Sequence, residues 1–213
     1  MIDWAWIGRH TDDIWSATRE HLVLTALPVL LGLILAVPLG ILATRTPRLA
    51  TPVLAVSGVL YTIPALAMFV FMIPFTGLTV TSAVIALTIY TLIVLVRATI
   101  DGLASVPRDV REAAEAMGYR PAARLLRVEL PLALPVLIAG IRIATVSTIG
   151  LVAIGVIINV GGLGRLVYSL GFQRNFFMTP IWTGLALIVA LSVVADLALI
   201  AVERRLTPWS RGR

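Results

Sequence analysis

The residues most able to do chemistry lie in one polar segment, EAAEAMGYRPAARLLRVELP at 112–131, within an otherwise apolar chain. The segment combines carboxylates with guanidinium groups, which form strong ion pairs and hydrogen bonds. A covalent catalyst would need a nucleophile activated by a neighbouring base, and no such constellation occurs along the chain. We therefore expect no enzymatic activity in this chain.

The spacing predicts two short helices within 106–129. The first would take Ser105 as its N-cap and end at Gly118. Its apolar residues recur at i, i+3, i+4 and i+7 and are mostly small, so that a partner can approach closely. These residues are Val110, Ala113, Ala114 and Met117. We expect this stripe to lie in a tight groove on another protein.

The second short helix would open at Pro121 and carry a basic face. Arg120, Arg124 and Arg127 recur at i, i+4 and i+7 on that face. The interpretation we favour is contact with lipid headgroups, because basic residues beside a membrane bind anionic lipid.

The elements that must position this segment are membrane spans, and the predicted fold class is all-α. Hydrophobic residues make up 59% of the 213 residues and charged residues only 13%, far from the composition of soluble domains. The apolar runs are about twenty residues long, enough to cross a hydrocarbon core as helix. We expect one transmembrane domain over 1–213, with a polar loop at 98–130. The five predicted spans are 22–44, 52–74, 79–97, 131–158 and 181–202.

The composition also excludes several classes of site. All 17 basic residues are arginine and there is no cysteine, so the chain has neither a P-loop lysine nor a thiolate metal site. His10 and His21 have no acidic cluster at metal-ligand spacing, and we expect no metal. The net charge of +6 follows the membrane pattern, so we expect a lipid bilayer and no nucleic acid as partner.

Arginine placement orients the spans, because cytoplasmic loops are enriched in basic residues. The 45–51 loop, the 97–130 segment and the C-terminal tail carry twelve arginines, and the other side carries four. The twelve are Arg45, Arg48, Arg97, Arg108, Arg111, Arg120, Arg124, Arg127, Arg204, Arg205, Arg211 and Arg213. We therefore expect the N-terminus outside and the C-terminus in the cytoplasm.

Two ionisable residues, Arg142 and Asp196, lie within predicted spans. From the helical rise, they lie about 16 and 12 Å from the cytoplasmic ends of their spans. Because an unpaired charge in the bilayer is costly, we expect an ion pair that holds the last two spans together. A gating role for the pair is the alternative.

The spacing of the polar segment resembles the EAA loop of ABC-importer permeases. Glu112-Ala113-Ala114, three residues, Gly118, nine residues and Val128-Glu129-Leu130-Pro131 follow the pattern E-A-A-x3-G-x9-I-x-L-P, with valine for isoleucine. The resemblance implies a type I importer fold in which the loop is a coupling helix that docks on a cytoplasmic ATPase dimer. ATP and magnesium would then bind the ATPase, and this chain would hold no cofactor. The residues implied in docking are Val110, Arg111, Glu112, Ala113, Ala114, Met117 and Gly118.

Three further stretches, YTIPALAMFVFMIP, ELPLALPVLIAGIR and GGLGRL, are similar to permeases of osmoprotectant importers, which carry glycine betaine, choline or carnitine. The resemblance covers roughly 20–206 and implies alternating access in a bacterial inner membrane. It also implies a second permease chain and an extracytoplasmic binding protein. Because a quaternary ammonium favours aromatic faces, Tyr61 is the leading candidate for the substrate path, with Pro64, Met68 and Asn159. Asn159 and Val160 depart from the small residues expected in the turn before GGLG.

Other functions remain open at this point. One is an ABC importer for another small polar solute, such as an amino acid. An ion-coupled carrier is a second, although such carriers usually have several intramembrane carboxylates and repeated halves. A membrane scaffold without a transport path is a third, and co-purification of an ATPase would argue against it.

Overall fold

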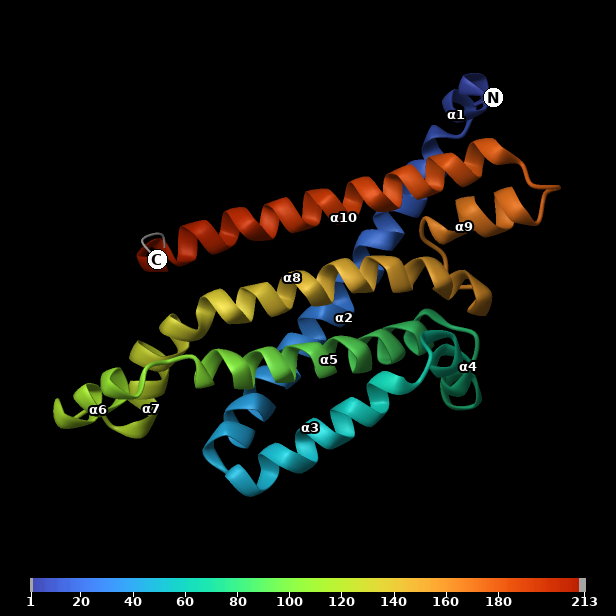
Figure 1. Cartoon of the computed structure of the whole chain (residues 1–213). Helices are drawn as coiled ribbons and strands as arrows, with labels where there is room; N and C mark the ends of the chain where they lie inside the picture. Colours follow the sequence, from blue (N-terminus) through green and yellow to red (C-terminus); the bar gives the residue numbers. More distant parts are fainter. Residues whose placement is uncertain (1, 211–213) are drawn as a thin grey trace.

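The structure, a computed structural model, describes residues 2–210 as helices joined by short turns (Figure 1). The predicted tail arginines Arg211 and Arg213 lie outside the described residues. Four helices are long and apolar enough to cross a membrane, or up to five spans if one bent pair counts as a span. The predicted all-α membrane fold is confirmed.

The elements follow one another closely along the chain. A short α1 (Trp4–Arg9) precedes the long α2 (Thr11–Arg45), and the bent pair α3 (Pro47–Thr62) and α4 (Ala65–Thr76) follows. Next come α5 (Val80–Ala104), α6 (Arg108–Ala116), α7 (Pro121–Arg124) and a π-helical turn, η1 (Leu125–Glu129). The chain continues with α8 (Leu130–Ile154), the 3₁₀ turn η2 (Gly155–Ile158) and α9 (Gly164–Val167). A second π turn, η3 (Tyr168–Phe172), then leads to α10 (Met178–Leu206) and the 3₁₀ turn η4 (Pro208–Ser210).

Helix α5 lies at the centre of the bundle and packs against α2, α3, α4 and α8. Small residues allow this close packing: a Cβ on Gly32 would overlap Thr91, and one on Gly140 would overlap Ala98. Helix α10 packs on α8 and α9 at the side of the bundle and leaves an apolar face free. Small residues at these crossings therefore let α2, α5 and α8 approach one another closely.

The predicted second span, 52–74, is not one helix. It breaks at Ile63 and Pro64, and the two halves meet at 97°. Proline has no N–H and disfavours helical backbone in the residue before it, so Ile63 is extended. The carbonyl of Ile63, freed by the break, accepts a hydrogen bond from the Tyr90 hydroxyl of α5. Met68 and Phe69 then bury α4 against the bundle.

Polar groups secure the turn after α8 at the end of the bundle where the N-terminus lies. Glu20 accepts a hydrogen bond from the Gly162 N–H at 3.0 Å and pairs with Arg165 at 3.2 Å. The buried His21 ring contacts the Ile149 carbonyl and the Leu163 N–H at 3.0 and 3.2 Å. Since Nδ1 accepts from Leu163, Nε2 carries the proton and donates to Ile149. His21 therefore joins α2 and α8 to the turn.

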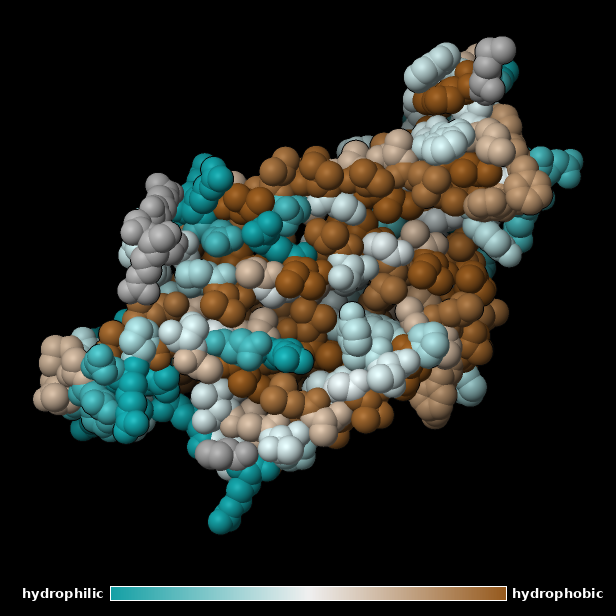
Figure 2. Space-filling view, in the orientation of Figure 1, coloured by the Kyte–Doolittle hydropathy of each residue, from teal (hydrophilic) through white to brown (hydrophobic). Residues whose placement is uncertain are grey.

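The two ends of the bundle differ in character. The C-terminus, α6, α7 and the α2–α3 turn gather at one end, while α1, α4 and α9 lie at the other (Figure 1). Figure 2 shows hydrophilic residues concentrated around α6 and α7, with apolar residues covering most of the bundle between the ends. The three segments that carry most of the arginines thus share one end of the molecule.

Candidate functional site

Helix α6 projects from the polar end of the bundle, as the sequence predicts for a docking helix. It ends where Gly118 adopts a left-handed conformation with φ of 80°, and the predicted termination is confirmed. The predicted N-cap is wrong: Pro107 precedes α6, and the Ser105 hydroxyl instead donates to the Gly102 carbonyl at the end of α5. Proline before the helix removes one N–H that would otherwise need a partner.

The apolar residues of α6 do not all face the same way: one is buried against the bundle and the others are exposed. Ala114 is buried against the chain's own bundle, whereas Val110 and Ala113 are exposed and Met117 is 70% exposed. Glu112 is also exposed and pairs with Arg108 at 2.8 Å. An exposed methionine beside small residues forms an adaptable apolar contact surface. We call Val110, Ala113 and Met117 the free face of α6.

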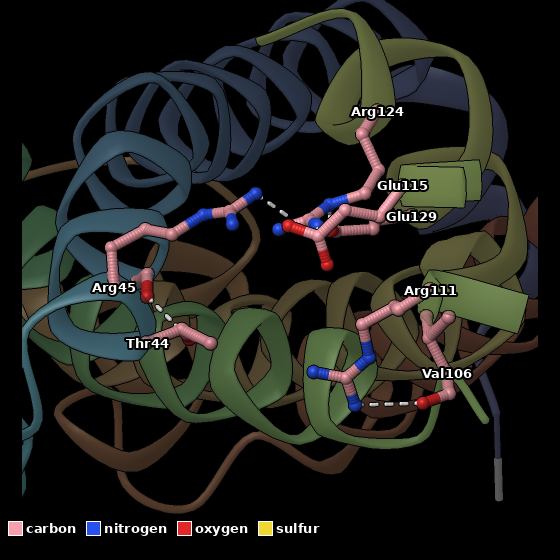
Figure 3. A network of polar contacts seen from close by, with 8 residues as sticks. Thr44, Arg45, Val106, Arg111, Glu115, Arg124 and Glu129 are labelled. Carbon is pink, nitrogen blue, oxygen red and sulfur yellow. Dashed lines mark hydrogen bonds and ion pairs between the residues drawn. The ribbon is translucent and has the colours of Figure 1, made fainter. Parts of the chain in front are cut away.

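Arg111 points back toward the bundle and away from the free face. Its Nη2 donates to the Val106 carbonyl at 2.7 Å, and its Nε is buried without a hydrogen-bond partner among the described residues (Figure 3). Arg111 therefore fastens α6 to the turn after α5.

A cluster of ion pairs that the sequence did not indicate lies behind α6. Arg124 is only 14% exposed and contacts Glu129 at 2.8 Å and Glu115 at 3.1 Å, and Arg45 contacts Glu129 at 2.9 Å (Figure 3). The expectation of one lipid-facing basic surface is therefore wrong for Arg124, although Arg120 and Arg127 are exposed. Arg45 is far away in sequence, so no local spacing could reveal this contact.

An apolar groove runs between α3, α5 and α8. One part, of about 440 Å³, is lined by Leu54, Tyr61, Ile143 and others, and has Arg97 and Asp101 at its edge. A second part of about 360 Å³ shares Tyr61, Val94 and Ile143 with the first and continues past Pro64 and Tyr90. The groove is open on one side, where Tyr61 is 61% exposed.

The structure distributes the four predicted substrate-path residues unevenly. Tyr61 and Pro64 line the groove. Met68 is buried in the core between α4 and α5, and Asn159 closes η2 in a left-handed conformation with φ of 61°. Neither of these two residues is part of the groove lining.

Arg142 and Asp196 lie together between α8 and α10. The Arg142 Nε and Nη2 donate to the two Asp196 carboxylate oxygens at 2.8 and 3.1 Å. A carboxylate oxygen of Glu203, also on α10, lies 3.5 Å from the Arg142 Nη1. A bidentate pair of this kind fixes both the distance and the rotation of the two helices.

Known proteins resemble the chain along most of its length. It is 42% identical over 198 residues to the osmoprotectant import permease protein OsmW of Salmonella typhimurium, covering 91% of each chain. It is 35% identical over 197 residues to the choline transport system permease protein OpuBB of Bacillus subtilis, covering 92% of this chain and 89% of the relative.

The fold is similar to that of a chain in an inward-facing structure of the MetNI methionine ABC transporter. The TM-score is 0.84 at 27% identity, covering 97% of this chain and all of that one. Residues 36–208 match the family described as binding-protein-dependent transport system inner membrane component. The chain belongs to this family, as a multi-pass inner-membrane permease that works with an ATPase and a binding protein.

Proposed function

We propose that this chain is the permease subunit of an ATP-driven importer for quaternary-ammonium osmoprotectants such as glycine betaine, choline or carnitine. The observation that carries the proposal is the likeness, over nine-tenths of both chains, to permeases named for osmoprotectant and choline transport. The chain takes no part in hydrolysis and holds no cofactor. ATP and magnesium bind the partner ATPase.

The free face of α6 is the proposed docking surface for that ATPase. Its exposed apolar residues lie at the polar end of the bundle, beyond the apolar band that suits lipid. With this end in the cytoplasm, the twelve arginines of the inner side agree with the positive-inside tendency. The N-terminus is then outside and the C-terminus inside.

The groove between α3, α5 and α8 is the proposed substrate path. Its walls are mostly apolar, and Tyr61 offers an aromatic face that suits a cation without hydrogen-bond donors. Arg97 and Asp101, 3.8 Å apart at the groove edge, offer both charges to a zwitterion. Because the groove is open on one side, a second permease chain, identical or related, covers it. Alternating tilting of the two chains then exposes the path to either side.

Uptake by the reconstituted importer tests the substrate class. Proteoliposomes containing this chain, its ATPase and its binding protein should accumulate radiolabelled glycine betaine, choline or carnitine only with ATP inside. Excess unlabelled methionine tests the amino-acid alternative and should leave this uptake unchanged. Uptake of methionine in place of the quaternary amines, or uptake driven by an ion gradient without ATP, would contradict the proposal.

A further inference from the structure

Glu129 joins three elements at the polar end of the bundle. Its side chain is 7% exposed, one carboxylate oxygen contacts Arg45 at the end of α2, and the other contacts Arg124 of α7. Arg124 continues to Glu115 on α6. The two arginines and two glutamates have no net charge together. Their contacts run without a gap from Glu115 on α6 to Arg45 at the end of α2 and Glu129 at the start of α8 (Figure 3).

The π turn η1 makes the contact between Arg124 and Glu129 possible. In an α-helix, residues five apart point about 140° away from each other. In a π turn the hydrogen bonds join residues five apart, and here Leu130 N–H bonds to the Leu125 carbonyl, so that such residues lie on one face. Conversion of η1 to α-helix would separate Arg124 from Glu129.

We infer that Glu129 is a positioning residue that transmits the movement of α6 to α2 and α8. The inference rests on the proposed docking of the ATPase at α6. A further connection is needed because Ala114 is the only buried residue of α6, and the hydrogen bond from Arg111 to the Val106 carbonyl ties α6 only to the turn after α5. The ion pairs supply that connection. Glu129 is buried between Arg45 and Arg124 and is costly to separate from either of them, and the largely buried Arg124 in turn pairs with Glu115 of α6, whose side chain is 70% exposed.

The number of solute molecules transported per ATP hydrolysed measures how well the ion pairs connect α6 to α2 and α8. In the complete importer, Glu129→Gln keeps the size of the side chain and removes its charge. Docking of the ATPase and hydrolysis should persist, while solute moved per ATP falls roughly tenfold. Arg127→Gln is the matched control, because Arg127 lies in the same π turn, is exposed and has no ion pair within residues 2–210. Equal transport per ATP in these two variants would overturn the inference.

A second variant keeps the test decisive if the Glu129→Gln importer fails to assemble. Arg124→Lys retains the charge, but an ammonium lacks the planar fork that engages two carboxylates at once. It should give an intermediate loss of transport per ATP with the complex intact. Wild-type transport per ATP in Arg124→Lys would count against the inference.

Distance measurement separates transmission from stability. The chain has no cysteine, so spin labels can be attached at Leu42→Cys on α2 and Ala116→Cys on α6, both exposed. The distance distribution should broaden with Glu129→Gln and stay narrow with Arg127→Gln. Identical distributions in the two variants would overturn the inference. Absence of ATP-driven uptake by the wild-type complex would instead refute the proposed function on which the inference rests.

Discussion

Arg142 on α8 and Asp196 on α10 form a two-pronged ion pair, with contacts of 2.8 and 3.1 Å between the two helices. Their similar expected depth in the bilayer is the only sequence signal for this contact. Glu203 lies 3.5 Å from the same guanidinium, so that the single cation of Arg142 faces two carboxylates, those of Asp196 and Glu203.

This imbalance predicts unequal effects of the two neutral substitutions. Arg142→Gln leaves Asp196 and Glu203 facing each other without a cation, whereas Asp196→Asn leaves Arg142 paired with Glu203. The thermal midpoint of the purified permease should therefore fall more for Arg142→Gln than for Asp196→Asn. Equal falls, or the reverse order, would contradict the role given to Glu203, and midpoints unchanged in both variants would show that the pair does not hold α8 and α10 together.

Two glycines on α8 should respond in opposite ways to alanine. A Cβ at Gly140 would collide with Ala98 of α5, so Gly140→Ala should lower the free energy of unfolding by about 1–3 kcal/mol. A Cβ at Gly150 meets nothing within 4 Å, so Gly150→Ala should raise it by about 0.5–1 kcal/mol through helix propensity. Unfolding in mixed micelles measures both values, and a stable Gly140→Ala variant would contradict the close packing of α5 and α8.

Tyr90 contacts the bend between α3 and α4 through its hydroxyl, which donates to the Ile63 carbonyl. Tyr90→Phe removes the hydroxyl that satisfies the Ile63 carbonyl, and the free energy of unfolding should fall by about 0.5–1.5 kcal/mol. Tyr61→Phe is the matched control, because the exposed Tyr61 hydroxyl makes no hydrogen bond within the described part of the chain. The same unfolding assay measures both variants. An equal loss of stability in Tyr90→Phe and Tyr61→Phe would show that the Tyr90 hydroxyl does not stabilise the bend.

Replacement of Tyr61 should change the KM for the transported solute and leave the free energy of unfolding unchanged. If its ring faces the quaternary ammonium, Tyr61→Ala should raise the KM of ATP-driven uptake about two- to fivefold, whereas Tyr61→Phe should stay near wild type. Leu54→Ala, which removes apolar lining from the same groove, is the control for a general loss of packing. A KM that is unchanged in Tyr61→Ala would remove Tyr61 from the substrate path.

The sequence predicted best what depends on local pattern. Apolar runs located the spans, because their length must match the bilayer, and Gly118 marked the end of α6, because glycine takes a left-handed conformation without strain. The break at Ile63 and Pro64 was missed, since proline occurs inside other helices of this chain, including Pro28 and Pro38 of α2. Whether proline bends a helix or breaks it depends on partners such as Tyr90, which are distant in sequence.

The ion pairs behind α6 illustrate the same limit. Helical spacing placed Arg124 on a basic face with Arg120 and Arg127, but the π turn brought Glu129 beneath it instead. Nothing in the amino-acid composition of 125–129 indicates that these residues form a π turn and not an α-helical turn. Contacts made through it, and through Arg45 from α2, appear only once the chain is folded.

Cross-linking from the free face of α6 tests the central claim most directly. With cysteine absent from the sequence, Met117→Cys at the end of α6 and Gly8→Cys in α1 each introduce one thiol, and α6 and α1 lie at opposite ends of the bundle (Figure 1). In membranes containing the whole importer, a thiol-to-amine cross-linker of short span should join residue 117 to the ATPase and leave residue 8 unjoined. An impermeant thiol reagent added outside intact cells should label residue 8 alone. Labelling of residue 117 from outside, or its failure to join an ATPase that supports uptake, would contradict the assignment of α6 as the docking helix.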